Sequence, residues 1–225
     1  MQRALLKLYN MREYPDLRFR SLKASIRPKI ITSSYITLNN FVSIDHYWVT
    51  GFCDGEGCFY LRIRENVKSK IGWSVELVFY LHIHIKDKAL LQAIQKLFGG
   101  IGNISNNGKK AVQFQVTSIK EIGIIIDHFD KYSLITQKWS DYQLFKMAFY
   151  IVKNKEHLTL DGIKKLVAIK SSLNKGLPEN FKESFPNVEP ISRPSVENKK
   201  IINPNWLAGF ISAEGCFFCS DWKVI

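Results

Sequence analysis

The sequence predicts an α+β fold in which helices cover one face of an antiparallel sheet. Several segments alternate apolar and polar residues with a period of two, which is typical of strands with one buried and one exposed face. Segments with helical periodicity separate them, in the order helix, two strands, helix, two strands, helices. Hydrophobic residues make up 46% of the 225-residue chain, which is enough for a packed core.

The first helix and the first strand pair follow Asp45. This residue is a suitable N-cap for a helix that ends at about Asp54. Next, Phe59, Leu61 and Ile63 alternate with polar residues, which predicts a strand. A polar turn over 65–72 follows, and a longer alternation over 74–85 predicts the second strand.

The second helix and strand pair lie between residues 88 and 117. The predicted helix covers 88–98, and Gly99 and Gly100 end it. A hairpin is predicted around Asn106-Asn107-Gly108, with its second strand over 111–117. Further helices are predicted over 119–132, 138–154 and 159–173, so the unit reads αββαββα.

Two segments differ in composition from this unit. Residues 1–43 form a basic, acid-poor N-terminal extension. An organelle transit peptide, a fused upstream reading frame and a DNA-contacting arm all share this composition, and all three remain open. Prolines and charged residues mark a linker over 177–202, which separates a first domain at 44–176 from a segment at 203–225.

The net charge of the chain indicates which kinds of partner it can bind. A formal charge of +12 and a pI near 9.5 favour a polyanionic partner such as nucleic acid, although a merely basic protein has the same charge. No apolar run approaches the roughly 18 residues that span a bilayer, so we expect no membrane partner. The four cysteines are interpreted as reduced, small hydrophobic residues rather than metal ligands.

An internal repeat is the most informative feature. Residues 48–61 read WVTGFCDGEGCFYL, and residues 206–219 read WLAGFISAEGCFFC. Tryptophan, glycine, phenylalanine, glutamate and cysteine coincide at a constant offset, which indicates duplicated architecture. The second copy follows Asn203-Pro204, a strong helix-start signal.

The repeat predicts two helices in close contact. Small residues four positions apart let two helix backbones approach, and both copies have such a pair: Gly51 with Gly55, and Gly209 with Ala213. Each helix ends in an acid, Glu56 or Glu214. Carboxylates that meet at one end of a helix pair suit a hard divalent cation such as Mg²⁺ and metal-assisted phosphodiester cleavage. The alternative is two helix-ending acids without a metal.

These residues resemble the two LAGLIDADG motifs of single-chain homing endonucleases from fungal mitochondrial introns. The resemblance implies a mitochondrial protein with two αββαββα halves, each with a saddle-shaped antiparallel sheet. It implies that Glu56 with Gly55, and Glu214 with Ala213, bind the divalent metals. A basic residue of the family supports the water network near the metals, and Lys138 in Leu134–Lys138 matches it.

The resemblance also implies site-specific cleavage of double-stranded DNA that lies along the exposed sheet face. A two-stranded ribbon fits the major groove, where polar side chains read base edges. The candidates on the predicted exposed face and its turn are Tyr60, Arg62, Arg64, Asn66, Lys68, Lys70, Ser74, Glu76, Tyr80, His82, Gln113, Gln115 and Thr117.

The sequence departs from the family pattern after its second motif. It ends at Ile225, shortly after Gly215, so the second half is expected to be largely missing. From this we expect half-site binding and poor or absent double-strand cleavage by this chain. A maturase that binds intron RNA is the alternative function. A monomer is expected, and a homodimer joined through the first motif helices is the alternative assembly.

Overall fold

A computed structural model describes residues 44–174, 176–177, 179–196, 200–201 and 203–215. The basic N-terminal extension and the last ten positions of the chain lie outside these residues. Among the described helices, none has the length and apolarity that a membrane crossing requires.

The chain begins its regular structure with helix α2 (His46–Glu56). The Asp45 side chain caps it by accepting hydrogen bonds from the N–H groups of Tyr47 and Trp48. Gly57 ends the helix and begins strand β1 (Gly57–Glu65), which pairs antiparallel with β2 (Trp73–His84). The helix therefore runs directly into the sheet, and its last carboxylate lies at the start of β1.

The sheet has four antiparallel strands in the order β1-β2-β4-β3. Strands β3 (Asn103–Asn107) and β4 (Ala111–Val116) form the predicted hairpin, and Gly108 has the positive φ of 74° that its turn requires. The register opposite β2 pairs Tyr80 with Gln115 and His82 with Gln113. Polar positions of three strands thus share one face.

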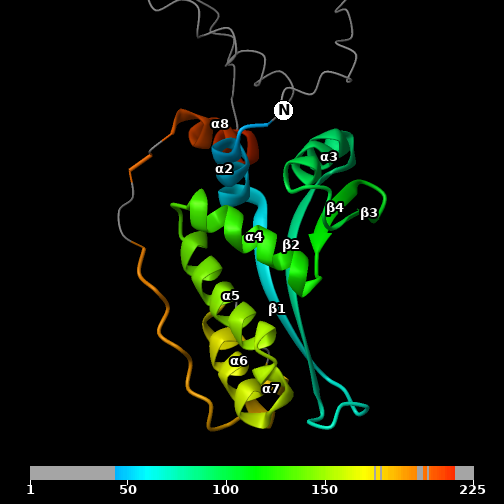
Figure 1. Ribbon diagram of the computed structural model, residues 1–225, viewed down its shortest axis with the longest axis vertical. Helices are drawn as coiled ribbons and strands as arrows, with labels where there is room; N and C mark the ends of the chain where they lie inside the picture. Colours follow the sequence, from blue (N-terminus) through cyan, green and yellow to red (C-terminus); the bar gives the residue numbers. More distant parts are fainter. Residues whose placement is uncertain (1–43, 175, 178, 197–199, 202, 216–225) are drawn as a thin grey trace, which may run out of the picture.

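Helices cover the other face, as the sequence predicts (Figure 1). The short η1 (Ile85–Asp87) leads into α3 (Lys88–Leu97), and α4 (Ile119–Lys131) follows the second hairpin. Helix α5 (Lys138–Lys153), η2 (Glu156–Leu158) and α6 (Leu160–Ser172) complete the layer. Aromatic rings join the two layers: Phe59 lies 5.4 Å from Phe129 and 5.3 Å from Phe145, centroid to centroid.

The free edge of β1 is covered by side chains of the helical layer. Lys170 Nζ donates to the carbonyl oxygen of Leu61 at 2.8 Å, and Asn174 Nδ2 donates to that of Phe59 at 2.7 Å. Both carbonyls lack a strand partner within the described part of the chain, because β1 pairs there with β2 alone. These two contacts satisfy polar groups that an exposed edge would leave open to other chains.

The predicted linker departs from expectation, because much of it is docked on the domain. It contains a short helix that was not predicted, α7 (Glu179–Ser184). Residues 186–196 then run back along α5 and α6 (Figure 1). Arg193 donates to Asp141 and to the carbonyl of Ser172, and Ser140 Oγ donates to the Pro194 carbonyl. Proline-rich composition indicated a break in regular structure, but it does not report such side-chain contacts.

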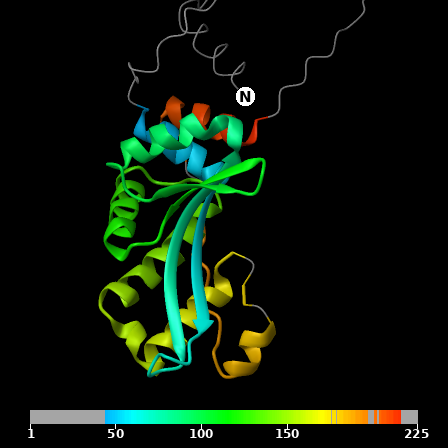
Figure 2. The ribbon, with the colours of Figure 1, turned by 90° about the vertical axis from the view of Figure 1, so that its right-hand side faces the viewer.

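Helix α8 (Pro204–Glu214) is the second motif helix. It begins as predicted, with Asn203 as N-cap and Pro204 in the first turn. Figures 1 and 2 both show α8 beside α2 at one end of the molecule, and the long β1–β2 ribbon extends from there to α7. The contact between α2 and α8 sets the geometry of the candidate site.

Candidate functional site

The two motif helices approach closely enough that their backbones touch. A β-carbon added at Gly51 would lie 1.9 Å from the Trp206 carbonyl oxygen. One added at Gly209 would lie 1.9 Å from the Trp48 carbonyl oxygen. No side chain fits at either position, so glycine is required at both. The matching distances give the pair a local two-fold symmetry.

The same crossing brings the terminal acids of the two helices together. A β-carbon added at Gly55 would meet Ala213 Cβ at 2.5 Å and Glu214 Oε1 at 3.3 Å, so Glu214 reaches the end of α2. Burial, and then the charge of Glu214, raise the pKa of Glu56 above its usual value. The two carboxylates are thus electrostatically coupled, and a nearby positive charge would stabilise their ionised forms.

Lys138, the first residue of α5, lies at this point. Its Nζ donates a short hydrogen bond to the Gly55 carbonyl oxygen. Its charge lowers the pKa of Glu56, as does that of His82 on β2. The structure therefore places Glu56, Gly55, Ala213, Glu214 and Lys138 in one cluster at the junction of α2, α8 and α5.

The cluster also contains Asp54, which the sequence pattern did not indicate as a site residue. Its buried carboxylate accepts hydrogen bonds from Ile135 N–H (3.0 Å), Thr136 N–H (3.3 Å) and the Thr136 hydroxyl (2.6 Å), and from the indole Nε1–H of Trp206 (2.8 Å). One signal in the sequence was available: Asp54 is acidic, whereas the repeat has Ser212 at the matching position.

The oxygen-rich cluster fits a hard divalent cation. Two carboxylates from adjacent helix ends and nearby backbone carbonyls are the donor type that Mg²⁺ and Ca²⁺ prefer. The coupling of Glu56 to Glu214 is the observation that favours such an ion, because a cation would offset their repulsion. The described residues contain no group of three or more His, Cys, Asp or Glu arranged to hold a metal, so water or a phosphate would have to complete the coordination.

The candidate nucleic-acid residues lie along the exposed sheet face and its turn. Inward positions of β1, β2 and β4 are mostly buried, and the alternate positions carry mostly polar side chains, with the buried Val78 of β2 as an exception. Residues Tyr60, Arg62 and Arg64 lie on β1; Ser74, Glu76, Tyr80 and His82 on β2; Gln113 and Gln115 on β4; Thr117 just after β4; Asn66, Lys68 and Lys70 in the β1–β2 turn.

Several of these side chains already have partners within the protein. Arg62 forms an ion pair with Glu76 directly across the ribbon. Gln113 Nε2 donates to Gln115 Oε1 at 3.1 Å. Both pairs are partly exposed, so a ligand can compete for them at small cost. Arg64, Lys68, Lys70 and His82 are exposed.

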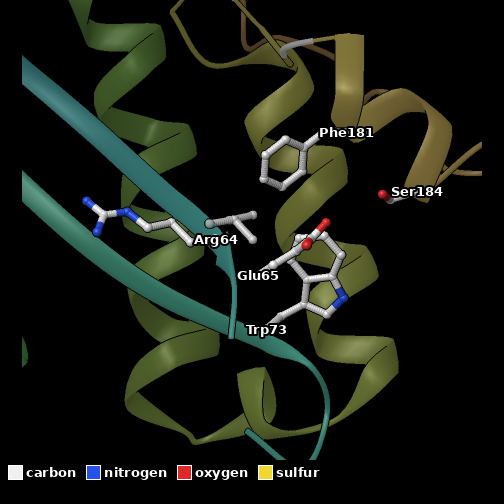
Figure 3. Close-up of a pocket in the computed structure, with 6 residues that line it drawn as sticks. Arg64, Glu65, Trp73, Phe181 and Ser184 are labelled. Atoms are coloured by element: carbon white, nitrogen blue, oxygen red, sulfur yellow. The ribbon is translucent and has the colours of Figure 1, made fainter. Parts of the chain in front are cut away.

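A separate cavity of about 300 Å³ lies at the far end of the ribbon, away from the carboxylates. Figure 3 shows Trp73, Glu65 and Phe181 around it, while the Arg64 side chain extends away. Trp73 packs against Phe181 and Phe185 at 5.5 and 5.0 Å between ring centroids. The contacts dock α7 on the ribbon, and the lining has no cluster of catalytic groups.

Known proteins resemble this chain in sequence and in fold. The family model for the LAGLIDADG endonuclease matches residues 49–149. "Probable intron-encoded endonuclease 2" of Neurospora crassa is 41% identical over 183 residues, which are 76% of this chain and 40% of that protein.

Two solved structures have the same fold. The LAGLIDADG meganuclease I-CpaMI bound to uncleaved DNA is 47% identical, with a TM-score of 0.74 over 76% of this chain and 58% of that one. I-SmaMI, bound to its uncleaved DNA target in the presence of calcium ions, is 43% identical, with a TM-score of 0.74 over 75% and 58%.

The matched region contains the first motif, the four-stranded sheet and most of the covering helices. The chain spans less than half the length of the curated Neurospora crassa relatives that it matches, 35% and 40%. The fold, the matched residues and the relatives agree, and the chain belongs to the LAGLIDADG endonuclease family.

Proposed function

We propose that this chain is the DNA-binding and metal-binding part of an intron-encoded homing endonuclease that cleaves double-stranded DNA. The observation that carries the proposal is the position of the two coupled carboxylates, Glu56 and Glu214, at the end of a polar, basic sheet face. The names of the relatives favour an endonuclease over an RNA-binding maturase.

The sheet face binds one half of the target. The β1–β2 ribbon has the width of a major-groove reader, and its outward residues form rows that can contact successive base pairs. Arginine suits guanine and glutamine suits adenine, so Arg62, Arg64, Gln113 and Gln115 are the proposed base-reading residues. Lys68 and Lys70 in the exposed turn contribute phosphate contacts, which strengthen binding at low salt.

The carboxylates hold a divalent cation, which we propose to be Mg²⁺. Glu56 and Glu214 are its proposed side-chain ligands, and the carbonyls of Gly55 and Ala213 add oxygen donors. When bound, the ion lowers the pKa of a water molecule and screens the charge that develops on the scissile phosphate. Lys138 holds its ammonium group beside Glu56 and orients the Gly55 carbonyl, and it would order water near the phosphate.

The relatives support an intron-encoded origin for this chain, but they do not test its localisation, its oligomeric state or its division into domains. The Neurospora crassa relative is named as intron-encoded, which supports the same origin for this chain. Mitochondrial localisation and a monomeric state stay predictions, as does the division into a first domain at 44–176 and a second motif segment at 203–225.

A binding selection tests the proposal. The 225-residue chain would be mixed with random-sequence duplexes in Ca²⁺, and the bound DNA sequenced after several rounds. We expect one enriched motif about half as long as a full homing site. Arg64→Ala should weaken binding and relax one base position. The matched control is Lys164→Ala, which removes an exposed charge from α6 and should leave the motif unchanged.

The selected duplex then serves to test cleavage in Mg²⁺. Any strand nicking by the wild-type chain should be lost in Glu56→Gln, while binding is kept, because the substitution removes a proposed ligand and no sheet contact. The proposal fails if no motif is enriched, or if Lys164→Ala and Arg64→Ala weaken binding equally.

A further inference from the structure

The buried Asp54 carboxylate joins three elements that the candidate site needs. It lies on α2, accepts two backbone N–H groups and a hydroxyl from residues 135–136, and accepts the indole N–H of Trp206 on α8. A carboxylate has about four acceptor positions. The four donors fill them, so Asp54 has no lone pair left for a metal and is not a candidate ligand.

The contacts continue from Thr136 to Lys138. The Thr136 hydroxyl donates to Asp54 and accepts the backbone N–H of Lys138 at 3.2 Å. Helix α5 lacks a side-chain cap from its N-cap residue Gln137, so this hydroxyl fixes the first turn of the helix. Lys138 Nζ then returns to the Gly55 carbonyl, next to Asp54 in the chain. The result is a closed ring of hydrogen bonds around the end of α2.

We propose that Asp54 is a positioning residue that couples the docking of α8 to the placement of the Lys138 ammonium group at the Gly55 carbonyl. Trp206 supplies one of the four donors. Docking of α8 therefore completes the set of hydrogen bonds to Asp54 that holds residues 135–138. This inference rests on the proposed role of the cluster in metal binding, but the coupling itself concerns only contacts within the protein.

The repeat makes the coupling one-sided. Ser212 occupies the position in α8 that matches Asp54, and its hydroxyl donates to the Ala208 carbonyl of the same helix at 2.7 Å. Among the described residues, Trp48 has no hydrogen bond to a carboxylate comparable to that of Trp206. Trp206→Phe and Trp48→Phe therefore form a matched pair, since both rings stack on a phenylalanine of their own helix at 5.0 and 5.3 Å.

Per-lysine labelling measures the coupling without any enzyme activity. The full chain would be reductively methylated, and the rate at Lys138 compared by mass spectrometry with that at the exposed Lys109. Complete loss of a hydrogen bond to a charged group typically changes such a rate by about tenfold or more, and partial loss by less. We expect Trp206→Phe to raise the Lys138 rate about fivefold, Asp54→Asn to raise it at least as much, and Trp48→Phe to leave it within about twofold.

A third variant shows which hydrogen bond of the closed ring around the end of α2 transmits the effect to Lys138. Thr136→Val keeps the shape and removes the hydroxyl, so it should raise the Lys138 rate while leaving the Trp206 indole N–H resonance where it is. Asp54→Asn should shift that resonance. If Asp54→Asn does not fold, Trp206→Phe and Thr136→Val still decide the matter.

Two results would overturn the coupling. One is equal Lys138 rates in Trp206→Phe and Trp48→Phe, which would indicate general loosening of the helix pair. The other is an unchanged rate in both Trp206→Phe and Thr136→Val. Failure of the DNA selection with a positive labelling result would reject the proposed function and leave the coupling intact, and the reverse holds as well.

Discussion

The two motif helices have the same backbone contacts but different side-chain environments. Gly51 and Gly209 each face the other helix's tryptophan carbonyl at the same distance, and each helix is capped at its C-terminus by a glycine N–H, Gly57 or Gly215. Yet α2 buries six consecutive residues, Val49–Asp54, whereas α8 buries Trp206 and Gly209 within the described structure.

Two of the matched positions differ in their polar contacts. Thr50 of α2 corresponds to Ala208 of α8, and Asp54 corresponds to Ser212. Thr50 and Asp54 bind α4 and the segment before α5, whereas Ser212 binds its own helix. The repeated glycines therefore set how the helices cross, whereas Thr50 and Asp54 give α2 polar contacts to its domain that α8 lacks within the described structure.

The largest expected effect is the difference in stability between substitutions at the matched positions Asp54 and Ser212. Asp54→Ala leaves buried N–H and O–H donors without an acceptor and should lower the free energy of unfolding by about 3 kcal/mol. Ser212→Ala should change it by less than about 0.5 kcal/mol, since its hydroxyl only bonds back to its own helix. Denaturant unfolding of both variants measures this. Equal losses would mean that the two helices are held alike.

A second pair of substitutions tests the shared crossing. Gly51→Ala and Gly209→Ala should weaken docking of α8 to similar extents, by about 2 kcal/mol or more, because each added carbon meets a backbone carbonyl. Hydrogen exchange in the amides of α8 reports the loss. Gly123→Ala on α4 is the control, since its added carbon would make an ordinary 3.7 Å contact with Phe149. Protection of α8 that survives either motif substitution would contradict the close approach.

The smallest expected effect is a loss of stability at acidic pH that is caused by the buried His128. Thr50 Oγ1 donates to the Tyr132 carbonyl at 3.1 Å, so it accepts from His128 Nε2–H, also at 3.1 Å. Burial, and then the charge of His46, lower the His128 pKa to about 3. Between that value and the unfolded value near 6.5, only the unfolded state gains the proton. Stability therefore falls as pH falls through this window.

The expected loss from this group between pH 6.5 and 5.5 is about 1 kcal/mol. His128→Gln should flatten that limb of the stability curve relative to wild type. A wild-type slope in His128→Gln would show that other groups cause the acid sensitivity.

The sequence predicted most of the fold because local signals agreed. Period-two alternation located β1, β2 and β4, and the caps Asp45 and Asn203 located the starts of α2 and α8. The repeat also led to Glu56 and Glu214, whose proximity follows from the spacing of small residues along each helix.

The rest depended on contacts between distant residues. The role of Asp54 required knowledge that residues 135–136 and Trp206 approach it from separate elements. The docking of residues 186–196 depends on Arg193 meeting Asp141, and neither position has a periodic pattern that would pair them. Periodicity reports which face of an element is buried, but not which polar groups meet.

The most direct test of a shared metal site is a double-mutant cycle on divalent-ion affinity. Calorimetric titration of Ca²⁺ would compare wild type, Glu56→Gln, Glu214→Gln and the double variant. If both carboxylates hold one ion, the second substitution should cost much less after the first, with a coupling of about 1 kcal/mol or more. A site built from both helices would be contradicted if the two substitutions changed the Ca²⁺ binding free energy additively to within about 0.5 kcal/mol. It would also be contradicted if Glu214→Gln left the Ca²⁺ affinity unchanged.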